Sequence, residues 1–271
     1  MGFDKEKPLI SDCLATQEIS GSEFKKRLER YSVAKARSLA MSEYIKSTQH
    51  SRYNKIASTV AECGSLLWFK NYFEKGEVRL HSASFCQKHT LCPFCAIRRG
   101  GKFIKAYMSK LESLRALYPN LKPYMLTLTV KDAENLSERV LHLRSSIRNY
   151  MEKRRKYLAS ETSKRNRPHV ELVKALGGVY SIEIKRGKNS GLWHPHVHFV
   201  ILCDHSNEIN VKKLSEEWLE ITGDSFIVDC RSFYSAESDC VVDGFLEIFK
   251  YALKFSDMSL EDNFHAYETL N

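Results

Sequence analysis

The sequence predicts an α+β protein built around an antiparallel sheet of the split βαβ type, with helices on one face of the sheet. From residue 124 onward, stretches that alternate apolar and polar residues take turns with stretches whose apolar residues recur at helical spacing. Their order is β-α-β-β-α-β-α, and the first six elements match the split βαβ pattern of ferredoxin-like folds. Turn residues at 186–191 join the second and third strands, which predicts a hairpin.

Each predicted strand is a short run rich in β-formers, and most helices begin or end at a recognisable signal. The strands are predicted at 124–130, 178–185, 196–202 and 226–233, and the helices at 102–118, 133–158, 211–221 and 242–255. Asn135 followed by Glu138 resembles a capping box at the start of the second helix. Pro119 closes the first helix and Gly223 the third.

The composition is that of a soluble globular protein with a sizeable core. The chain has 271 residues, 43% hydrophobic and 28% charged, which suits one large or two small domains. The net charge of +9 favours polyanionic partners without separating DNA from RNA or a membrane surface. A membrane-spanning helix and a signal peptide are not expected, because no apolar stretch is long enough for the first and the N-terminus lacks the apolar region of the second.

Four parts follow one another along the chain. Residues 1–60 are basic and predicted to form one or two amphipathic helices, either as an accessory DNA-binding region or as a solvated extension. Residues 61–100 are rich in cysteine, residues 101–260 carry the α+β pattern, and residues 261–271 are read as a tail.

Two histidines at the start of the third strand predict a metal site. His196 and His198 are two residues apart, so both imidazoles project from the same face of the strand. Glu183 lies across the predicted hairpin in an otherwise apolar strand, where a buried carboxylate is costly unless it is paired or binds a metal. Two imidazoles and a carboxylate leave coordination positions open for phosphate oxygens. The alternative is that the histidines are surface polar residues, and Glu183 argues against it.

A tyrosine lies on the last predicted helix. Glu247, Tyr251 and Lys254 share one helix face, because they are four and three residues apart. A phenol is a poor nucleophile near its usual pKa of about 10, so its attack needs a polarised phosphate or a nearby cation such as Lys254. Glu247 can act as a base toward water. The alternative is an ordinary helix with a surface Glu–Lys pair.

The cysteine-rich segment predicts a structural zinc site. Cys86, Cys92 and Cys95 are three of its ligands, and either His89 or Cys63 is the fourth. Eight cysteines in a chain without export signals favour thiols or metal ligands over disulfides. The alternative is a set of buried free thiols, since cysteine packs as a small hydrophobe.

Basic residues and one tryptophan are candidates for contact with nucleic acid. The basic residues form two groups. One group follows the cysteines, and the other lies at the end of the helix predicted at 133–158, where a run of charges is also typical of a solvated surface. Trp193 flanks the histidines and either stacks on an unpaired base or packs in the core. The basic candidates are Arg98, Arg99, Lys102, Lys153, Arg154 and Arg155.

Together these residues resemble the rolling-circle replication initiator (Rep) proteins of bacterial single-strand-DNA plasmids, which belong to the HUH superfamily of endonucleases. Three segments of this chain resemble the three motifs of the family and occur in the same order. The resemblance covers roughly residues 60–257. The motifs correspond to Leu126–Val130, to His194–His198 with the apolar run after it, and to Glu247 with Tyr251 and Lys254. The cysteine segment also resembles the Cys-rich stretch upstream of the first motif.

The resemblance implies an enzyme that nicks the plasmid origin. Tyr251 would attack a phosphodiester, forming a 5′-phosphotyrosine and a free 3′-hydroxyl primer, and Glu247 would activate the water that ends the cycle. His196 and His198 with Glu183 would hold Mg²⁺ or Mn²⁺. The resemblance also implies three partners, which are origin DNA, a host helicase and a host DNA polymerase. It further implies a homodimer that works in the cytoplasm of a bacterial host.

Two alternatives remain open at this point. Within the enzyme class, an HUH relaxase or transposase is the second hypothesis, although relaxases often place the tyrosine before the histidine strand. Outside it, the chain would be a non-catalytic, zinc-folded DNA-binding protein.

Overall fold

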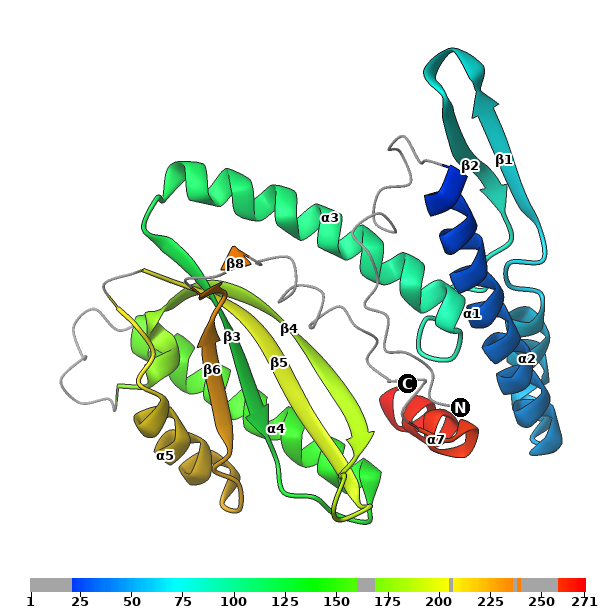
Figure 1. The fold of residues 1–271 in the computed structure, drawn as a ribbon. Helices are drawn as coiled ribbons and strands as arrows, with labels where there is room; N and C mark the ends of the chain where they lie inside the picture. The colour runs from blue at the N-terminus through cyan, green and yellow to red at the C-terminus, as the bar shows by residue number, and fades with distance from the viewer. Residues whose placement is uncertain (1–20, 160–168, 205–206, 236–237, 240–257) are drawn as a thin grey trace. The chain divides into compact units, whose positions relative to one another are not determined.

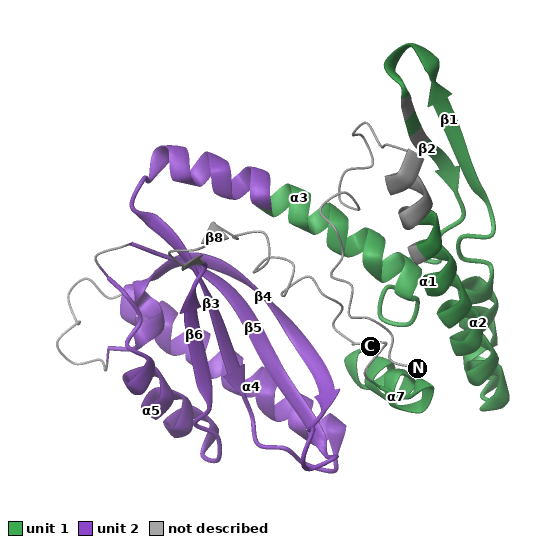
Figure 2. Cartoon of the chain, in the orientation of Figure 1, with its two compact units in different colours: residues 1–107, 249–251, 255–271 green, residues 108–248, 252–254 purple. Residues whose placement is uncertain are grey.

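The computed structural model describes residues 21–159, 169–204, 207–235, 238–239 and 258–271, which form a mixed α/β protein with antiparallel sheets (Figure 1). The chain divides into two compact units (Figure 2). Unit 1 comprises residues 1–107, 249–251 and 255–271, and unit 2 comprises residues 108–248 and 252–254. In the part of the chain that is described, no helix is both long and apolar enough to cross a membrane.

Unit 2 is built on a four-stranded sheet in the order β4-β5-β3-β6, and all neighbouring strands are antiparallel. β4 and β5 form a hairpin whose turn ends at Gly191, where φ is +66° and a side chain would be strained. The strands are β3 (Leu121–Thr129), β4 (Ala175–Arg186), β5 (Trp193–Asp204) and β6 (Val228–Ser232).

Two helices, α4 (Leu136–Leu158) and α5 (Val211–Thr222), cover one face of this sheet. The side chains of Asn135 and Asn210 cap their N-termini by accepting bonds from backbone N–H groups three residues on. Gly223 ends α5 with a left-handed φ of +75°. The core between sheet and helices includes Leu126, Leu128, Val197, Phe199, Leu143, Ile147, Leu214 and Trp218.

Strand alternation divides the sheet into a packed face and a polar face. Leu126 and Leu128 on β3 belong to the core beneath the helices. Thr127 and Thr129 alternate with them, so they lie on the opposite face. The register pairs Thr127 with His198 and Thr129 with His196, which brings both histidines to that polar face.

A buried tyrosine joins α4 to α5 beneath the sheet. The hydroxyl of Tyr150 donates to Glu217 at 2.6 Å, and the same carboxylate accepts the backbone N–H of Glu171. Burial, followed by the bond to Glu217, raises the pKa of Tyr150. The phenol therefore stays protonated and donates to the carboxylate.

Replacing Tyr150 by phenylalanine is expected to lower the free energy of unfolding by about 1–3 kcal/mol, because a buried hydrogen bond to a charged group is lost. Urea denaturation followed by circular dichroism measures this change. Tyr118→Phe is the matched control, since the Tyr118 side chain is exposed and its substitution is expected to change little. Equal stabilities of the two variants would contradict the prediction.

Unit 1 combines helices with a separate hairpin. Its helices are α1 (Gly21–Ser47), α2 (Asn54–Ala61), the first part of α3 (Pro93–Leu117), and α7 (Leu260–Leu270). The hairpin is formed by β1 (Leu67–Tyr72) and β2 (Glu77–Ala83). Its core includes Met41, Ile45, Val60, Leu91, Phe94, Phe264 and Tyr267.

The remaining elements are short. Among the described residues, 3₁₀ turns cover Ser51–Tyr53, Phe73–Lys75 and Glu171–Lys174. β7 (Tyr234–Ser235) and β8 (Ser238–Asp239) form a two-residue ladder.

The predicted elements of unit 2 are present where the structure describes them, with ends shifted by a few residues. The helix predicted at 102–118 begins earlier, at Pro93. Two features were not predicted: the hairpin β1–β2, and a helix where a tail was expected at the C-terminal end. The helix predicted at 242–255 lies outside the described residues.

Candidate metal centres

The hairpin β4–β5 brings Glu183, His196 and His198 together as the sequence predicts. Glu183 is the register partner of His196, and Ser181 is the partner of His198, so the carboxylate reaches both rings. Its Oε2 atom lies 2.7 Å from Nε2 of His196 and 2.8 Å from Nε2 of His198. One atom of each side chain therefore points to a common centre, which is the arrangement a metal ion requires.

All three side chains of this triad are buried. Glu183 is 5% exposed, His196 2% and His198 8%. Burial lowers the pKa of His196, and the hydrogen bond to Glu183 opposes this only in part. His196 is therefore neutral near pH 7, which is the form of imidazole that binds metals.

Neighbouring groups orient both imidazole rings. Thr127 Oγ1 on β3 lies 2.9 Å from Nδ1 of His198, and the carbonyl oxygen of His194 lies 3.4 Å from Nδ1 of His196. Partners on Nδ1 fix the ring plane and leave Nε2 to face the centre. The triad is therefore held by the sheet itself.

A third histidine forms a separate pair beside the triad. His194 Nδ1 lies 2.5 Å from Asp132 Oδ1, and Ser190 donates to the other oxygen of the same carboxylate. Burial would raise the pKa of Asp132, but the bonds from Ser190 and His194 lower it overall. Sequence reasoning missed Asp132. Its signal is an acid placed directly after the strand that pairs with the histidine strand.

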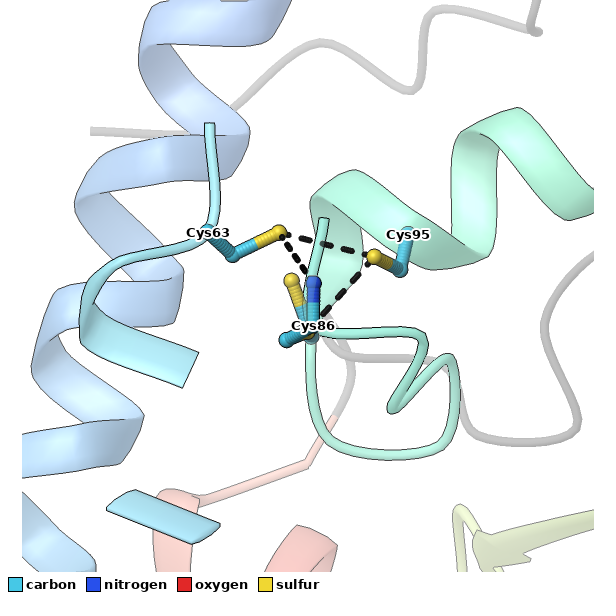
Figure 3. A group of neighbouring side chains, drawn as sticks. Cys63, Cys86 and Cys95 are labelled. Carbon is cyan, nitrogen blue, oxygen red and sulfur yellow. Dashed lines mark hydrogen bonds between the residues drawn. The ribbon is translucent and has the colours of Figure 1, made fainter. Parts of the chain in front are cut away.

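Unit 1 contains a second group of candidate ligands, Cys63, Cys86, Cys92 and Cys95. All four are buried, and their sulfur atoms lie within 4.8 Å of one another. Figure 3 shows Cys63, Cys86 and Cys95 directed toward each other, with Sγ–Sγ distances of 3.5 Å from Cys95 to each of the other two. Of the two alternatives for the fourth ligand, the structure brings Cys63 into the group, and His89 is not part of it.

Local structure explains how the four thiols meet. Cys63 follows α2 and Cys86 follows β2, while Cys92 and Cys95 lie at the start of α3. The N-terminus of a helix favours thiolate over thiol. Bonds from the other three thiols, Cys63 first, lower the pKa of Cys92, and Ser38 on α1 adds a contact of 3.3 Å to its sulfur.

Comparison with known proteins places these features in a family. The family model described as "Replication protein" (Rep_1) matches residues 77–270. The chain belongs to this replication protein family. The matched range includes the Glu183 triad and Cys86, Cys92 and Cys95, whereas Cys63 lies before it.

Curated relatives carry the name "Protein rep". The chain is 34% identical over 151 residues to "Protein rep" of Bacillus sp, covering 55% of this chain and 44% of the relative. It is 27% identical over 177 residues to "Protein rep" of Lactiplantibacillus plantarum, covering 65% and 51%. The chain thus spans about half the length of these relatives. No solved structure matches it significantly.

The predicted nucleophile of this replication protein lies outside the described residues. Tyr251, Glu247 and Lys254 all fall within 240–257.

The predicted nucleic-acid contacts near the cysteines have defined partners in unit 1. The Arg98 guanidinium stacks over the ring of Phe85 at 3.3 Å, and burial lowers its pKa. Arg99 lies 4.6 Å above Phe103, and Lys102 is exposed. Arg99 and Lys102 are therefore more accessible to a ligand than Arg98.

The predicted nucleic-acid contacts in unit 2 also include residues with partners inside the protein and residues that are exposed. Lys153 pairs with Glu220, and Arg154 donates to the carbonyl oxygens of Leu172 and Ala175. Arg155 is exposed. Trp193 is 4% exposed and covered by the Arg186 guanidinium at 3.7 Å, so the structure supports core packing for this ring rather than base stacking.

Proposed function

We propose that this replication protein is a plasmid rolling-circle initiator that nicks origin DNA by a metal-dependent, tyrosine-based mechanism. The observation that carries the proposal is the buried Glu183–His196–His198 triad on the polar face of an antiparallel sheet, in a chain of the replication protein family. The sheet order β4-β5-β3-β6 supports an HUH endonuclease fold, because the split βαβ arrangement requires that order.

The proposed reaction is a phosphoryl transfer. The phenol oxygen of Tyr251 forms a bond to phosphorus, the bond from phosphorus to the 3′-oxygen breaks, and the phenol proton is lost to solvent or a nearby base. The 3′-oxygen takes a proton and becomes the primer hydroxyl. Lys254, on the same predicted helix face, would offset the charge on the phosphate, and Glu247 would later deprotonate the water or hydroxyl that attacks the phosphotyrosine.

The triad would hold Mg²⁺ or Mn²⁺. Such an ion supplies a Lewis acid that polarises the scissile phosphate. The residues present fit this role, since two imidazoles and one carboxylate provide three ligands and leave positions open for phosphate oxygens. The protein's contribution is to orient the rings through Thr127 and the backbone of His194.

The four cysteines would hold a structural zinc ion. A tetrahedral centre with Zn–S bonds of roughly 2.3 Å has S–S edges of about 3.8 Å. The observed spacing, two contacts of 3.5 Å and all four sulfurs within 4.8 Å, fits such an edge. An iron–sulfur cluster places a core of iron and sulfide atoms between the thiolates, so it would hold them farther apart.

The partners of the proposal follow from the reaction. The substrate is a single-stranded or hairpin nick site in plasmid origin DNA, and the released 3′-hydroxyl is extended by a host polymerase behind a host helicase. The proposal also includes that the protein forms a homodimer and acts in the cytoplasm of a bacterial host. A relaxase or transposase would use the same chemistry, and the designation of the relatives favours replication.

The test is a covalent nicking assay with Tyr251→Phe. Wild-type protein, Mn²⁺ and a labelled single strand carrying the origin nick site are expected to give a protein–DNA adduct on a denaturing gel. Tyr251→Phe is expected to give none, because the ring without its hydroxyl cannot attack phosphorus, while still binding the same DNA.

Tyr234→Phe is the matched control, because it lies outside the tyrosine motif. This variant should form the adduct as the wild type does. An adduct that survives Tyr251→Phe would assign another nucleophile. DNA binding by the wild type with no adduct under any divalent ion would support the non-catalytic, zinc-folded DNA-binding alternative.

A further inference from the structure

A groove of about 760 Å³ lies between α4 and the edge strand β4, within unit 2. Three arginines of α4, Arg144, Arg148 and Arg155, line one wall. Tyr180 and Ile182 of β4 line the other. The proposed nicking mechanism uses none of these residues.

The groove lies on the opposite face of β4 from the metal centre. Side chains alternate along a strand, so Tyr180 and Ile182 project to the helix side, while Ser181 and Glu183 project to the polar face with the histidines. Because β4 is at the edge of the sheet, the groove and the metal centre lie on the two faces of the same edge strand.

The wall formed by α4 is continuous and anchored. Arg144, Arg148 and Arg155 recur at intervals of four and seven residues, so they share one helix face over about 16 Å of axis. Arg154, on the same helix, binds the carbonyl oxygens of Leu172 and Ala175 ahead of and at the start of β4. These two bonds tie the helix to the strand, so the groove is preformed.

The charge of the groove is positive. Its one acidic residue, Glu152, is paired with Lys156 at 2.6 Å, so this carboxylate is already neutralised. Among the described residues, no salt bridge engages Arg148 or Arg155. Both guanidinium groups are exposed and can pair with phosphates.

Tyr180 supplies an aromatic surface at the opposite wall. The side chain is 52% exposed, although its ring is held against the buried ring of Phe199 at a centroid distance of 5.2 Å. A ring that is fixed below and open above loses little conformational freedom when a base stacks on it. Basic grooves lined by such aromatics are typical of single-strand binding proteins.

We propose that this groove binds single-stranded DNA, with phosphates paired to Arg148 and Arg155 and one base stacked on Tyr180. The inference rests on the proposed function for the source of the strand, since nicking produces single-stranded DNA at the other face of β4. Its role is to retain the DNA beside the nick, independently of sequence.

The experiment measures binding of fluorescein-labelled oligothymidylate of about 12 nucleotides, within the roughly 4–16 nucleotides of known single-strand sites. The full chain is titrated at several salt concentrations. Arg148→Gln and Arg155→Gln are each expected to make the negative slope of log K against log salt shallower by about 0.7, because each removes one phosphate contact. Tyr180→Ala is expected to weaken binding at least about fivefold, and Tyr180→Phe to restore it.

Lys212→Gln is the matched control, because Lys212 is an exposed cation on α5, away from the groove. It should leave the slope unchanged. The proposal is overturned if Tyr180→Ala binds as tightly as wild type. It is equally overturned if polyglutamate displaces the oligonucleotide as effectively as unlabelled oligothymidylate, since the groove would then be a general polyanion surface.

The two proposals fail separately. If the wild type gives no adduct but the groove variants lose affinity for oligothymidylate, the nicking mechanism fails and the groove remains. If the adduct forms while Arg148→Gln, Arg155→Gln and Tyr180→Ala bind oligothymidylate normally, the groove proposal fails and the nicking mechanism remains. Thermal melting of each variant checks that it is folded.

Discussion

Replacing Cys63 by serine is expected to release one zinc ion per chain and to unfold unit 1 at a temperature at which the wild-type unit is folded. Apparent binding free energies of structural zinc are roughly 10–16 kcal/mol in small zinc-dependent folds. A typical domain is stable by only about 5–15 kcal/mol, so losing a ligand removes a large share of that stability. Elemental analysis measures the zinc content, and circular dichroism with limited proteolysis measures the unfolding.

Two variants serve as controls for Cys63→Ser. Cys230→Ser changes a partly buried cysteine of unit 2 and is expected to keep one zinc ion per chain. His89→Ala tests the other candidate for the fourth ligand and should also keep the ion, because His89 is not in the thiol group. A wild-type protein that contains no zinc after purification without chelators would refute the site. Loss of zinc in His89→Ala with retention in Cys63→Ser would reverse the ligand assignment.

Replacing Glu183 by glutamine is expected to reduce the nicking rate by at least about 100-fold and to remove its dependence on Mn²⁺. Glu183 is the only acidic ligand of the triad, and the amide cannot offer the charge that a hard cation prefers. Mutating residues that only orient metal ligands typically lowers metal affinity or activity by 10–100-fold, so mutating a direct ligand should lower them at least as much. Single-turnover nicking over a Mn²⁺ titration measures the effect.

A second measurement separates metal binding from catalysis in Glu183→Gln. An ion that binds the folded state stabilises it by about 2.7 kcal/mol at a concentration 100 times its dissociation constant. Mn²⁺ should therefore raise the melting temperature of wild type and leave that of Glu183→Gln unchanged. Glu220→Gln, at an exposed acid on α5, is the matched control and should respond as wild type does. A variant that nicks at the wild-type rate would exclude Glu183 from the centre.

The polar face of the sheet could be predicted from sequence because strand alternation is a strong constraint. Once 196–202 is a strand, His196 and His198 must share a face, and a two-strand hairpin leaves few positions for Glu183 other than opposite them. The helix cap at Asn135 was equally predictable, since the cap is a local interaction between a side chain and a nearby backbone N–H.

Other features depend on contacts between distant segments, which the sequence does not display. The presence of Cys63 in the thiol group in place of His89 depends on its contact with Cys95, 32 residues later in the chain. The pair of Asp132 with His194 arises from the bridge between Ala133 and Trp193. The hairpin β1–β2 was missed because its strands carry Lys70, Asn71 and Glu77 and bury little, so they lack a clear apolar alternation.

The positions of the cysteines also determine how the hairpin β1–β2 is attached. Cys63 and Cys86 lie on either side of it, 23 residues apart, so the proposed zinc ion, shared by their thiolates, would close the hairpin into a loop. By analogy with disulfide loops of that length, the closure would reduce the entropy of the unfolded chain by an amount worth roughly 3.4 kcal/mol. The hairpin would then be an arm held at its base by the ion, with Phe73, 85% exposed, at its tip.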